Sequence, residues 1–469
     1  MFTRVTSDII KNLITIVGEN NVITDTEMLE NYAHDETPLY YSLPEVAVKP
    51  SGPKEISEIL KLANEKRIPV TPRGGGTSLS AGSVPIYKGI VLSLERMKRI
   101  KEIDEKNLMV IVEPGIVTGE MDREIEKHNL FFPPDPVSLD SCTIGGNIAE
   151  CAGGPRAMKY GVTKNYVTGL EIVLPDGGVV RLGGKLLKNV TGYNLIELII
   201  GSEGTLAVVT EATLKVLPCP TVIFSLLIPF KTVADATQFS CEVIKMGLMP
   251  TAIELMEGDV VRAVGKYLGR DLPFSDAEAH TIIEIDSFDI SEGRRHYERL
   301  GEVAMKTGAL DVFVAESQKD RERIWEPRKK IGEALKVQTT IVAREDLVVP
   351  RDRISDLISQ LKDCVKKYNG TLYAFGHLGD GNIHTDVGFS DIKEAAEKRI
   401  DNNIIKTMRR EMYEITIRLG GTITAEHGIG LSKIQYLPLA LNRRALELMA
   451  GIKKEFDPNN ILNPGKIFG

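Results

Sequence analysis

Several residue types and patterns are scarce in this sequence. Its 469 residues include one tryptophan, five cysteines and seven histidines. The cysteines form no Cys-x-x-Cys pair, which argues against a disulfide scaffold and gives no spacing expected of an iron-sulfur cluster. Any electrons that such a chain handles must therefore leave by a route other than an iron-sulfur cluster of its own.

Long apolar runs and an excess of positive charge are also absent. There is no run of about 18 apolar residues, and Met1–Asp8 lacks the apolar core of a signal peptide, so we expect a cytoplasmic protein without a transmembrane segment. The net charge of −7 argues against a nucleic-acid partner. The chain is too long for one hydrophobic core, and two or three domains are expected.

Three of the histidines lie in two glycine-rich stretches, residues 375–384 and 424–433. In the first stretch, Gly-Asp-Gly-Asn separates two apolar runs, which predicts a hairpin that brings His377 and His384 together. Imidazole is a common ligand of divalent transition metals, and a carboxylate from another segment could complete an open site. Glu426 is the candidate for that carboxylate.

His427 follows Glu426 directly, and neighbours in an extended chain point to opposite faces. Both side chains reach one site if Gly428 and Gly430 let the backbone bend; one would then bind the metal and the other would handle a proton. A structural alternative is that these histidines only form hydrogen bonds within glycine-rich turns.

A first glycine-rich tract follows a predicted helix (residues 53–66) and a short strand (residues 68–71). Residues 73–82 offer amide groups and small hydroxyls that suit a pyrophosphate, although a flexible surface loop has a similar composition. The Rossmann pattern fails because its third glycine would fall at Leu79, and no P-loop lysine is present.

A second glycine-rich tract spans residues 132–161. Prolines stiffen its start, and its small residues would let a large flat ligand lie against the backbone. A tightly turned core loop would explain either tract alone. Because each tract follows a strand and a helix, a dinucleotide clamp is the better explanation.

The rest of the chain alternates strands and helices. A hairpin turn is predicted at residues 175–178, and Pro218 and Pro220 mark the first domain boundary. Strands are expected at 222–228, 252–256, 281–285 and 309–314, and helices at 233–246, 290–306, 392–419 and 443–456. This order predicts an α+β sheet packed under helices. An anionic substrate near the histidines would need a guanidinium group, although lone arginines are most often solvated.

Six motifs in order resemble the FAD-linked 2-hydroxyacid dehydrogenases, the family of the glycolate oxidase flavin subunit, D-lactate dehydrogenase and D-2-hydroxyglutarate dehydrogenase. The motifs cover residues 73–78, 144–147, 201–205, 377–384, 426–430 and 463–466. The resemblance implies a vanillyl-alcohol-oxidase/p-cresol-methylhydroxylase-type FAD-binding domain in residues 1–220. It further implies an α+β cap, or substrate, domain in 221–420 and a C-terminal segment in 421–469.

The resemblance also implies the residues that hold FAD. The first tract lacks the histidine to which covalent members attach the flavin, so non-covalent binding is expected. The implied cofactor-binding residues are Arg73, Gly74, Gly75, Gly76, Thr77, Ser78, Gly82, Pro134, Asp135, Ser141, Thr143, Gly145, Gly146, Asn147, Ala152, Gly153, Gly154, Tyr160, Gly161, Glu203, Gly204 and Asn463.

Metal ligands and substrate contacts are implied in the same way. His377, His384 and Glu426 match the ligands of a divalent metal (Zn, Fe, Mn or Co), and His427 matches the catalytic base. Arg328 matches the arginine that binds the substrate carboxylate, and Arg344 lies where some members have a second basic contact. Gly332 replaces a polar residue of the hydroxyglutarate enzymes, which favours lactate or glycolate over a longer dicarboxylate.

The implied reaction is oxidation of a small D-2-hydroxy acid, with D-lactate first and glycolate next. His427 would accept the hydroxyl proton while a hydride passes to flavin N5. The electrons would continue to an electron-transferring flavoprotein, an iron-sulfur subunit or a quinone, and some relatives are the dehydrogenase subunit of electron-bifurcating lactate dehydrogenase complexes. The alternatives are a non-catalytic FAD electron-relay subunit and a metal-dependent hydrolase or lyase without flavin.

Overall fold

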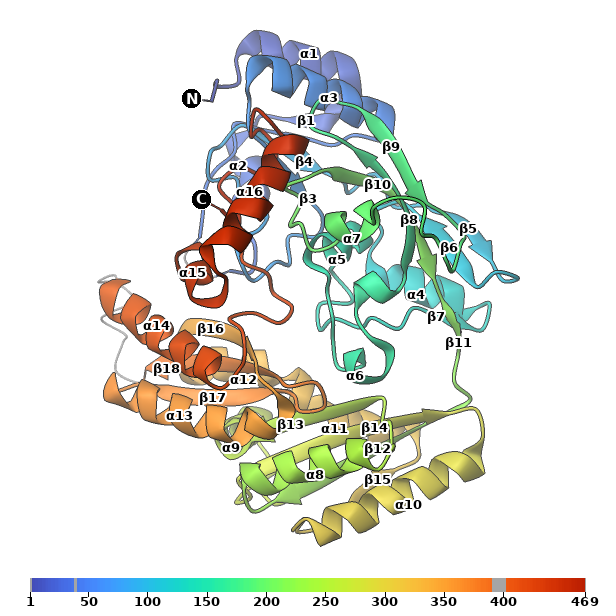
Figure 1. The fold of residues 1–469 in the computed structure, drawn as a ribbon, viewed down its shortest axis with the longest axis vertical. Coiled ribbons are helices and arrows are strands. Elements are labelled where there is room, and N and C mark those ends of the chain that lie inside the picture. The colour runs from blue at the N-terminus through green and yellow to red at the C-terminus, as the bar shows by residue number, and fades with distance from the viewer. Residues whose placement is uncertain (1, 38–39, 390–401, 469) are drawn as a thin grey trace. The chain divides into compact units, whose positions relative to one another are not determined.

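The chain divides into two compact units. The computed structural model describes residues 2–37, 40–389 and 402–468. The first unit joins Met1–Gly153, Val162–Cys219 and Glu426–Gly469, and the second joins Gly154–Gly161 and Pro220–Ala425. The C-terminal segment thus returns to the unit in which the chain began (Figure 1).

A four-stranded sheet lies at the centre of one half of the first unit. Its strand order is β1 (Val22–Ile23), β2 (Val46–Val48), β4 (Ile90–Ser93) and β3 (Val70–Arg73). Both β2 and β3 run parallel to β4, and α3 (Pro53–Lys66) provides the crossover that a parallel connection requires. Helix α3 begins with a proline in its first turn and buries Ile56, Ile59 and Leu60 at helical spacing against this sheet.

An antiparallel sheet of five strands forms the other half of this unit. Its order is β5 (Ile100–Asp104), β6 (Met109–Val112), β10 (Val208–Lys215), β8 (Val167–Val173) and β9 (Val179–Gly183). A two-stranded sheet pairs β7 (Leu130–Phe131) with β11 (Leu217–Pro218). The remaining helices are α1 (Ser7–Val17), α2 (Thr26–Leu29), α4 (Thr118–Glu126), α5 (Ile144–Glu150), α7 (Leu195–Ile199), α15 (Leu437–Ala440) and α16 (Arg443–Phe456).

One antiparallel sheet of seven strands organises the second unit. Its order is β15 (Phe313–Ala315), β12 (Val222–Phe230), β14 (Ala279–Ser287), β13 (Ala252–Glu257), β17 (Thr371–His377), β18 (Asn382–Phe389) and β16 (Thr340–Val348). Strands β13, β17, β18 and β16 are neighbours, and they carry most of the polar side chains discussed below.

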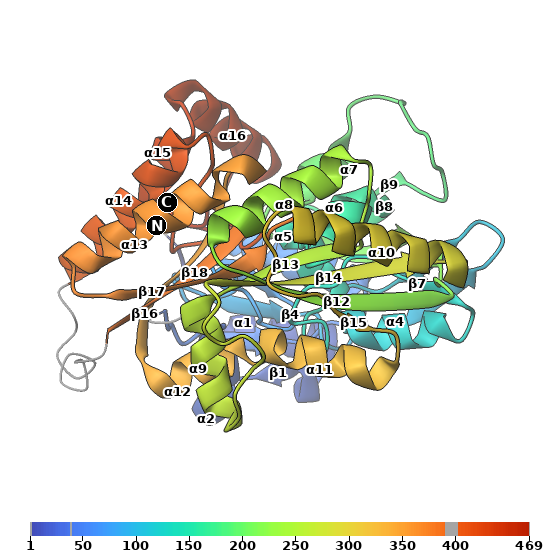
Figure 2. The same cartoon turned by 90° about the horizontal axis from the view of Figure 1, so that it is seen from below.

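Helices cover both faces of this sheet, as Figure 2 shows. One layer contains α8 (Val233–Lys245), α10 (Ile290–Lys306), α13 (Ile354–Lys367) and α14 (Asn402–Arg418). The other contains α9 (Gly258–Leu268), α11 (Gln318–Lys329) and α12 (Ile331–Gln338). The short α6 (Ala157–Tyr160) contacts β13. Single 3-10 turns are η1 (Glu19–Asn21), η2 (Glu30–Tyr32), η3 (Thr163–Asn165), η4 (Arg351–Arg353) and η5 (Ile434–Tyr436).

The predicted bounds of α3 and α16 are confirmed. A strand was expected at 309–314, but the strand in the structure is β15, which spans Phe313–Ala315. Ala309 makes only an isolated bridge to Phe230. The helix expected at 392–419 is described from Asn402 as α14, and its residues 392–401 lie outside the described part of the chain.

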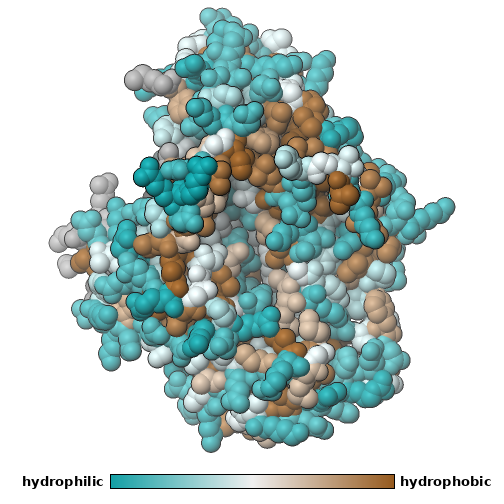
Figure 3. All heavy atoms as spheres, viewed as in Figure 1, coloured by the Kyte–Doolittle hydropathy of each residue, from teal (hydrophilic) through white to brown (hydrophobic). Residues whose placement is uncertain are grey.

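Among the described residues, no helix has the length and apolar composition needed to cross a membrane. Figure 3 shows hydrophilic side chains over much of the surface that faces the viewer, with apolar residues in smaller groups between them.

Candidate functional site

The two histidines of the first motif lie on neighbouring strands of the second unit. Strands β17 and β18 form the hairpin that the Gly-Asp-Gly-Asn turn predicts, and their register pairs Phe375 with His384 and His377 with Asn382. Gly381 adopts a φ of +94°, and a Cβ there would lie 2.2 Å from the carbonyl oxygen of Val349, so no larger residue fits this turn.

The facing imidazoles have the spacing of two ligands on one metal. The Nε2 atoms of His377 and His384 are 3.4 Å apart, and both side chains are buried. Two nitrogens bound at about 2.0–2.1 Å to a tetrahedral metal are separated by about 3.3–3.4 Å. The donor set and its spacing therefore fit a divalent metal, whose identity two imidazoles do not specify.

Glu254 on β13 holds the first histidine. Its Oε1 lies 2.6 Å from His377 Nδ1, which leaves the Nε2 atom directed at His384. Its Oε2 accepts a hydrogen bond from Arg328 Nε at 2.8 Å. Burial raises the pKa of Glu254, but the charges of His377 and Arg328 outweigh burial and lower it overall. A carboxylate behind a ligating imidazole is the usual arrangement around a bound metal.

Arg328 presents an unused donor beside these histidines. It lies on α11, is 7% exposed and stacks over the Phe375 ring, with Cζ 5.2 Å from the ring centroid. Among the described residues, its buried Nη2 has no hydrogen-bond partner. A buried guanidinium with an open donor can bind a carboxylate. Arg344, the second predicted arginine, has its Nε 3.4 Å from Asp386 Oδ2 on the paired strand β18.

Asp346 on β16 organises the other side of the histidine pair. Its Oδ1 accepts from Asn382 Nδ2 at 2.7 Å and lies 3.8 Å from His384 Nδ1. Its Oδ2 accepts from Thr424 Oγ1 at 2.8 Å and from the Ala425 amide at 2.9 Å. Both oxygens are thus engaged by the protein, which suits a group that orients His384. Asp346 and His384 also offer candidate ligand atoms within 4.8 Å of each other.

Neither Glu254 nor Asp346 was among the predicted site residues. Both are charged residues at fully buried strand positions, with side chains that are 0% exposed. For Glu254 the available signal was a carboxylate within the mainly apolar run Ala252–Met256, because such a group stays charged only with a partner. Asp346 gave no such signal, because Arg344 and Glu345 precede it in β16. The partner itself depends on strand pairing, which a single sequence does not reveal.

Glu426 and His427 open the C-terminal segment of the first unit. Gly428 and Gly430 have φ values of +78° and +47°, so the backbone bends where the sequence suggested. His427 Nε2 consequently lies 3.8 Å from Glu426 Oε1, although adjacent residues of an extended strand would point apart. The preceding residue is Ala425, whose amide is bonded to Asp346.

The first glycine tract packs against the second within the first unit. A Cβ on Gly74 would lie 2.3 Å from Thr143 Oγ1, and one on Gly75 would lie 2.2 Å from the Ser141 carbonyl oxygen. Among the described residues, the amides of residues 75–78 donate no hydrogen bond, so they are available to a phosphate. Arg73 donates instead to the carbonyls of His34 and Asn31 at 2.8 and 3.0 Å.

The second tract leads into α5 through Thr143, which caps Gly146. A Cβ on Gly145 would lie 2.7 Å from Pro114 Cβ, so the backbone of this tract approaches its neighbours closely. The loop between β7 and α5 contains Pro134, Asp135 and Ser141, while Ala152 bonds back to Asn147 at 2.9 Å. These contacts fit two backbone-lined tracts able to hold a dinucleotide.

The end of the second tract lies in the other unit. Gly154–Gly161 belongs to the second unit, and it includes the predicted cofactor residues Gly154, Tyr160 and Gly161. Tyr160 Oη donates to Asp286 Oδ2 at 2.6 Å, and Lys159 contacts the same carboxylate. The Tyr160 hydroxyl is thus used by β14 of its own unit.

Glu203, Gly204 and Asn463 meet behind the first tract. Asn463 Nδ2 donates to the carbonyls of Gly82 and Glu203 at 3.0 and 2.8 Å. A Cβ on Gly204 would contact Pro72 at 3.6 Å. The Glu203 carboxylate is bonded to the amides of Ile429 and Gly430. These contacts tie residues distant in the sequence to the glycine tract.

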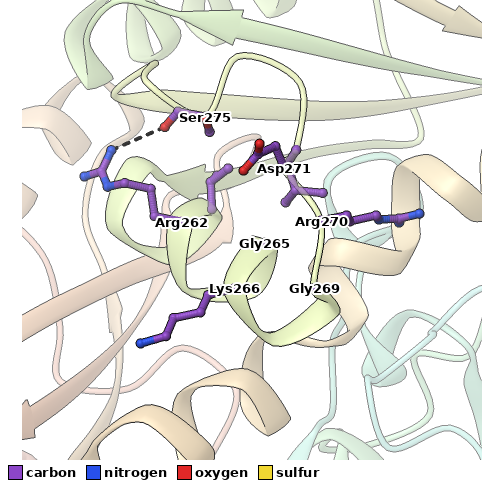
Figure 4. A pocket seen from close by; sticks show the side chains of 9 residues that line it. Arg262, Gly265, Lys266, Gly269, Arg270, Asp271 and Ser275 are labelled. Carbon is purple, nitrogen blue, oxygen red and sulfur yellow. Dashed lines mark hydrogen bonds between the residues drawn. The ribbon is translucent and has the colours of Figure 1, made fainter.

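A separate pocket of about 480 Å³ lies beside α9 and the loop that follows it (Figure 4). Arg262 donates a hydrogen bond to the Ser275 carbonyl oxygen at 3.4 Å. In Figure 4 the Lys266 side chain points away from Asp271. None of its nine lining residues is a predicted site residue.

Comparison with known proteins identifies the family. Residues 219–467 match the model for the C-terminal domain of FAD linked oxidases, and residues 44–183 match an FAD binding domain. The chain belongs to the FAD-linked oxidases. It is 39% identical to the glycolate oxidase subunit GlcD of Bacillus subtilis (strain 168), over 99% of this chain and 97% of that protein.

Two D-lactate dehydrogenases are similarly related to this FAD-linked oxidoreductase. The Anaerostipes hadrus protein is 35% identical over 99% of this chain and 98% of its own length. The Archaeoglobus fulgidus protein is 40% identical over 93% of this chain and 95% of its own length. The resemblance inferred from the six motifs is confirmed.

Solved structures confirm the predicted fold class. The p-cresol methylhydroxylase structure with substrate bound superposes with a TM-score of 0.81 and 16% identity, covering 98% of this chain and 96% of that one. The 4-ethylphenol oxidase of Gulosibacter chungangensis gives a TM-score of 0.79 and 19% identity, with the same coverage. The protein therefore has a vanillyl-alcohol-oxidase-type FAD-binding domain followed by an α+β domain.

Proposed function

We propose that this FAD-linked oxidoreductase oxidises a small D-2-hydroxy acid, D-lactate first and glycolate next, to the 2-oxo acid. The observation that carries the proposal is the buried group on the second unit's sheet: two imidazole nitrogens 3.4 Å apart beside a guanidinium with an unused donor. The names of the relatives at 35–40% identity favour the same substrates.

In this proposal His377, His384 and Glu426 hold a divalent metal such as Zn, Fe or Mn. Glu426 is covalently joined to Ala425, whose amide binds Asp346 beside His384. The Cα atoms of consecutive residues are about 3.8 Å apart, so the bond from the Ala425 amide to Asp346 restricts where the backbone of Glu426 can lie. This restriction supports Glu426 as the third metal ligand. FAD is bound non-covalently by the two glycine tracts, and the free amides of residues 75–78 in the first tract suit its phosphates.

The chain's own residues would position the substrate and move one proton. Arg328 binds the substrate carboxylate through Nη2, and Glu254 keeps the guanidinium in place at 2.8 Å. His427 accepts the hydroxyl proton at an imidazole nitrogen. FAD, when bound, supplies the hydride acceptor, and a divalent metal supplies positive charge beside the substrate hydroxyl.

The size of the substrate is proposed from Gly332 on α12. A Cβ at this position would meet no atom within 4 Å, so the glycine is not required by packing. The position offers no polar side chain for a second carboxylate, which favours lactate and glycolate. We further propose that the electrons pass to a protein partner, an electron-transferring flavoprotein or an iron-sulfur subunit, or to a quinone. The relative from Bacillus subtilis is itself named a subunit.

The test is flavin reduction by a His427→Asn variant in anaerobic stopped flow. With FAD bound, its reduction rate by D-lactate should fall by about 10²- to 10⁴-fold, the usual contribution of a positioned base. The control is His128→Asn, which removes an exposed histidine that contacts Glu105 at 2.6 Å in the same unit. A His427→Asn protein that is reduced at the wild-type rate would refute the assignment.

A further inference from the structure

The loop that follows His427 is anchored through four consecutive backbone amides. The amides of Ile429 and Gly430 donate to the two carboxylate oxygens of Glu203 at 2.7 and 2.6 Å. Those of Leu431 and Ser432 both donate to the carbonyl oxygen of Ser80 at 2.8 and 3.3 Å. Every amide from 429 to 432 is thus held by a residue far away in the sequence.

Glu203 is itself held rigidly. Its side chain is buried, and its backbone has a φ of +51°, a left-handed conformation that is unfavourable for a residue other than glycine. Its amide donates to the Ala149 carbonyl on α5 at 2.8 Å, and its carbonyl accepts from Asn463 at 2.8 Å. Such a conformation persists only where the surrounding contacts enforce it.

The loop also approaches this carboxylate too closely for a side chain. A Cβ on Gly428 would lie 2.9 Å from Glu203 Oε1 and 2.4 Å from Glu150 Oε2. On the other side of the loop, a Cβ on Gly430 would lie 2.0 Å from the Ser80 carbonyl oxygen. The backbone one to three residues after His427 therefore has little freedom to move.

We propose that Glu203 is a positioning residue that sets the backbone from which Glu426 and His427 project. The proposal rests on the proposed function, in which these two residues serve the metal and the proton. The carboxylate of Glu203 binds the loop and its backbone amide binds Ala149, so this residue couples the loop to α5, whose first residues belong to the second glycine tract. Glu203 acts through the loop and needs no contact with FAD.

The test compares Glu203→Gln with Glu211→Gln. Glutamine offers one acceptor oxygen and turns an NH₂ group toward the second amide, which breaks one of the paired bonds. Glu211 is a carboxylate on β10 of the same unit that binds Lys101 at 2.6 Å. Each FAD-loaded protein is studied by anaerobic stopped flow with D-lactate and by hydrogen exchange of the peptide covering residues 426–433.

In Glu203→Gln the limiting rate of flavin reduction should fall by about 10- to 100-fold, the cost of a displacement near 1 Å. The concentration of D-lactate at half-saturation should change far less, and the 426–433 peptide should exchange about 10-fold faster because its anchored amides open. Glu211→Gln should match the wild type. An unchanged exchange rate, or a wild-type limiting rate per bound flavin, would overturn the proposal.

A second variant covers the case in which Glu203→Gln does not hold FAD. Gly428→Ala pushes the loop away from an intact Glu203 and should give the same loss of limiting rate. Gly18→Ala is its control, with a φ of +83° and its nearest contact at 3.7 Å. A wild-type rate in Gly428→Ala would contradict the proposal.

The His427→Asn variant is measured in parallel to separate this proposal from the proposed function. If only His427→Asn reduces its flavin at the wild-type rate, the role of His427 as the base is refuted. Hydrogen exchange of the 426–433 peptide in Glu203→Gln then still decides the role of Glu203.

Discussion

Replacing Glu254 with glutamine should weaken metal binding and destabilise the second unit together. The carboxylate is fully buried between His377 and Arg328, at 2.6 and 2.8 Å. Removing one member of a buried ion pair costs about 3–5 kcal/mol, and because glutamine keeps one acceptor we expect about 3 kcal/mol. For a unit of about 200 residues, this loss lowers Tm by about 6–12 °C.

Metal affinity should fall at the same time, because the carboxylate fixes which nitrogen of His377 faces His384. Losing a group behind a ligating imidazole typically reduces metal affinity by about 10- to 100-fold. Competition with a chromogenic chelator measures the Kd for Zn²⁺ or Mn²⁺, and calorimetry measures Tm.

Glu257→Gln is the matched control. Glu257 lies on the same strand, is 1% exposed and binds Lys362 Nζ at 2.5 Å. Three positions separate it from Glu254, so it faces the opposite side of the sheet. The Glu257→Gln variant should therefore have a lower Tm and an unchanged Kd for the metal. Equal metal Kd values for the two variants, or no metal binding by the wild type, would refute the reasoning.

Two further predictions concern the first unit. Burial lowers the pKa of Lys466 from 10.5 to about 8, so between these pH values the folded protein binds fewer protons than the unfolded chain and its free energy of unfolding should rise with pH. The free energy of unfolding, measured with urea from pH 7 to 10, should rise by about 3 kcal/mol in the wild type and should not rise in this way in Lys466→Met. The same pH dependence in both proteins would contradict the prediction. Gly75→Ala places a Cβ 2.2 Å from the Ser141 carbonyl and should reduce FAD affinity at least about 10-fold, whereas Gly52→Ala, with no atom within 4 Å, should not. Fluorescence titration with FAD measures both, and equal affinities would show that the tract does not bind the cofactor.

Local patterns in the sequence predict the elements that local physics determines. Helix α3 is set by Pro53 and the spacing of its buried residues, and the hairpin of β17 and β18 by the turn at Gly379–Gly381. The closeness of His377 and His384 follows from that hairpin, because a two-strand register fixes which residues face each other.

Contacts between distant strands could not be predicted. Glu254 reaches His377 because β13 pairs with β17 in a register that joins these two residues, 123 positions apart. Asp346 meets Asn382 and Thr424 through β16, another long-range pairing. The burial of each carboxylate and the identity of its partner depend on a sheet order that alternation of polar and apolar residues does not encode.

The packing of Gly154–Gly161 with the second unit was equally hidden. The segment is continuous with the second glycine tract, so composition assigned both to one ligand site. In the structure the segment belongs to the second unit, where Asp286 on β14 accepts a hydrogen bond from Tyr160. Nothing in the sequence of residues 132–161 indicates that Asp286, on a strand far along the chain, accepts a hydrogen bond from this segment.

The most direct test of the account is the anaerobic visible spectrum of the FAD-loaded protein before and after addition of D-lactate, L-lactate, glycolate or D-2-hydroxyglutarate. The account predicts that the flavin bands bleach with D-lactate, more slowly with glycolate, and little with the other two acids. Flavin that stays oxidised with all four acids in protein confirmed to contain bound metal would contradict oxidation of a small 2-hydroxy acid as the function of this site.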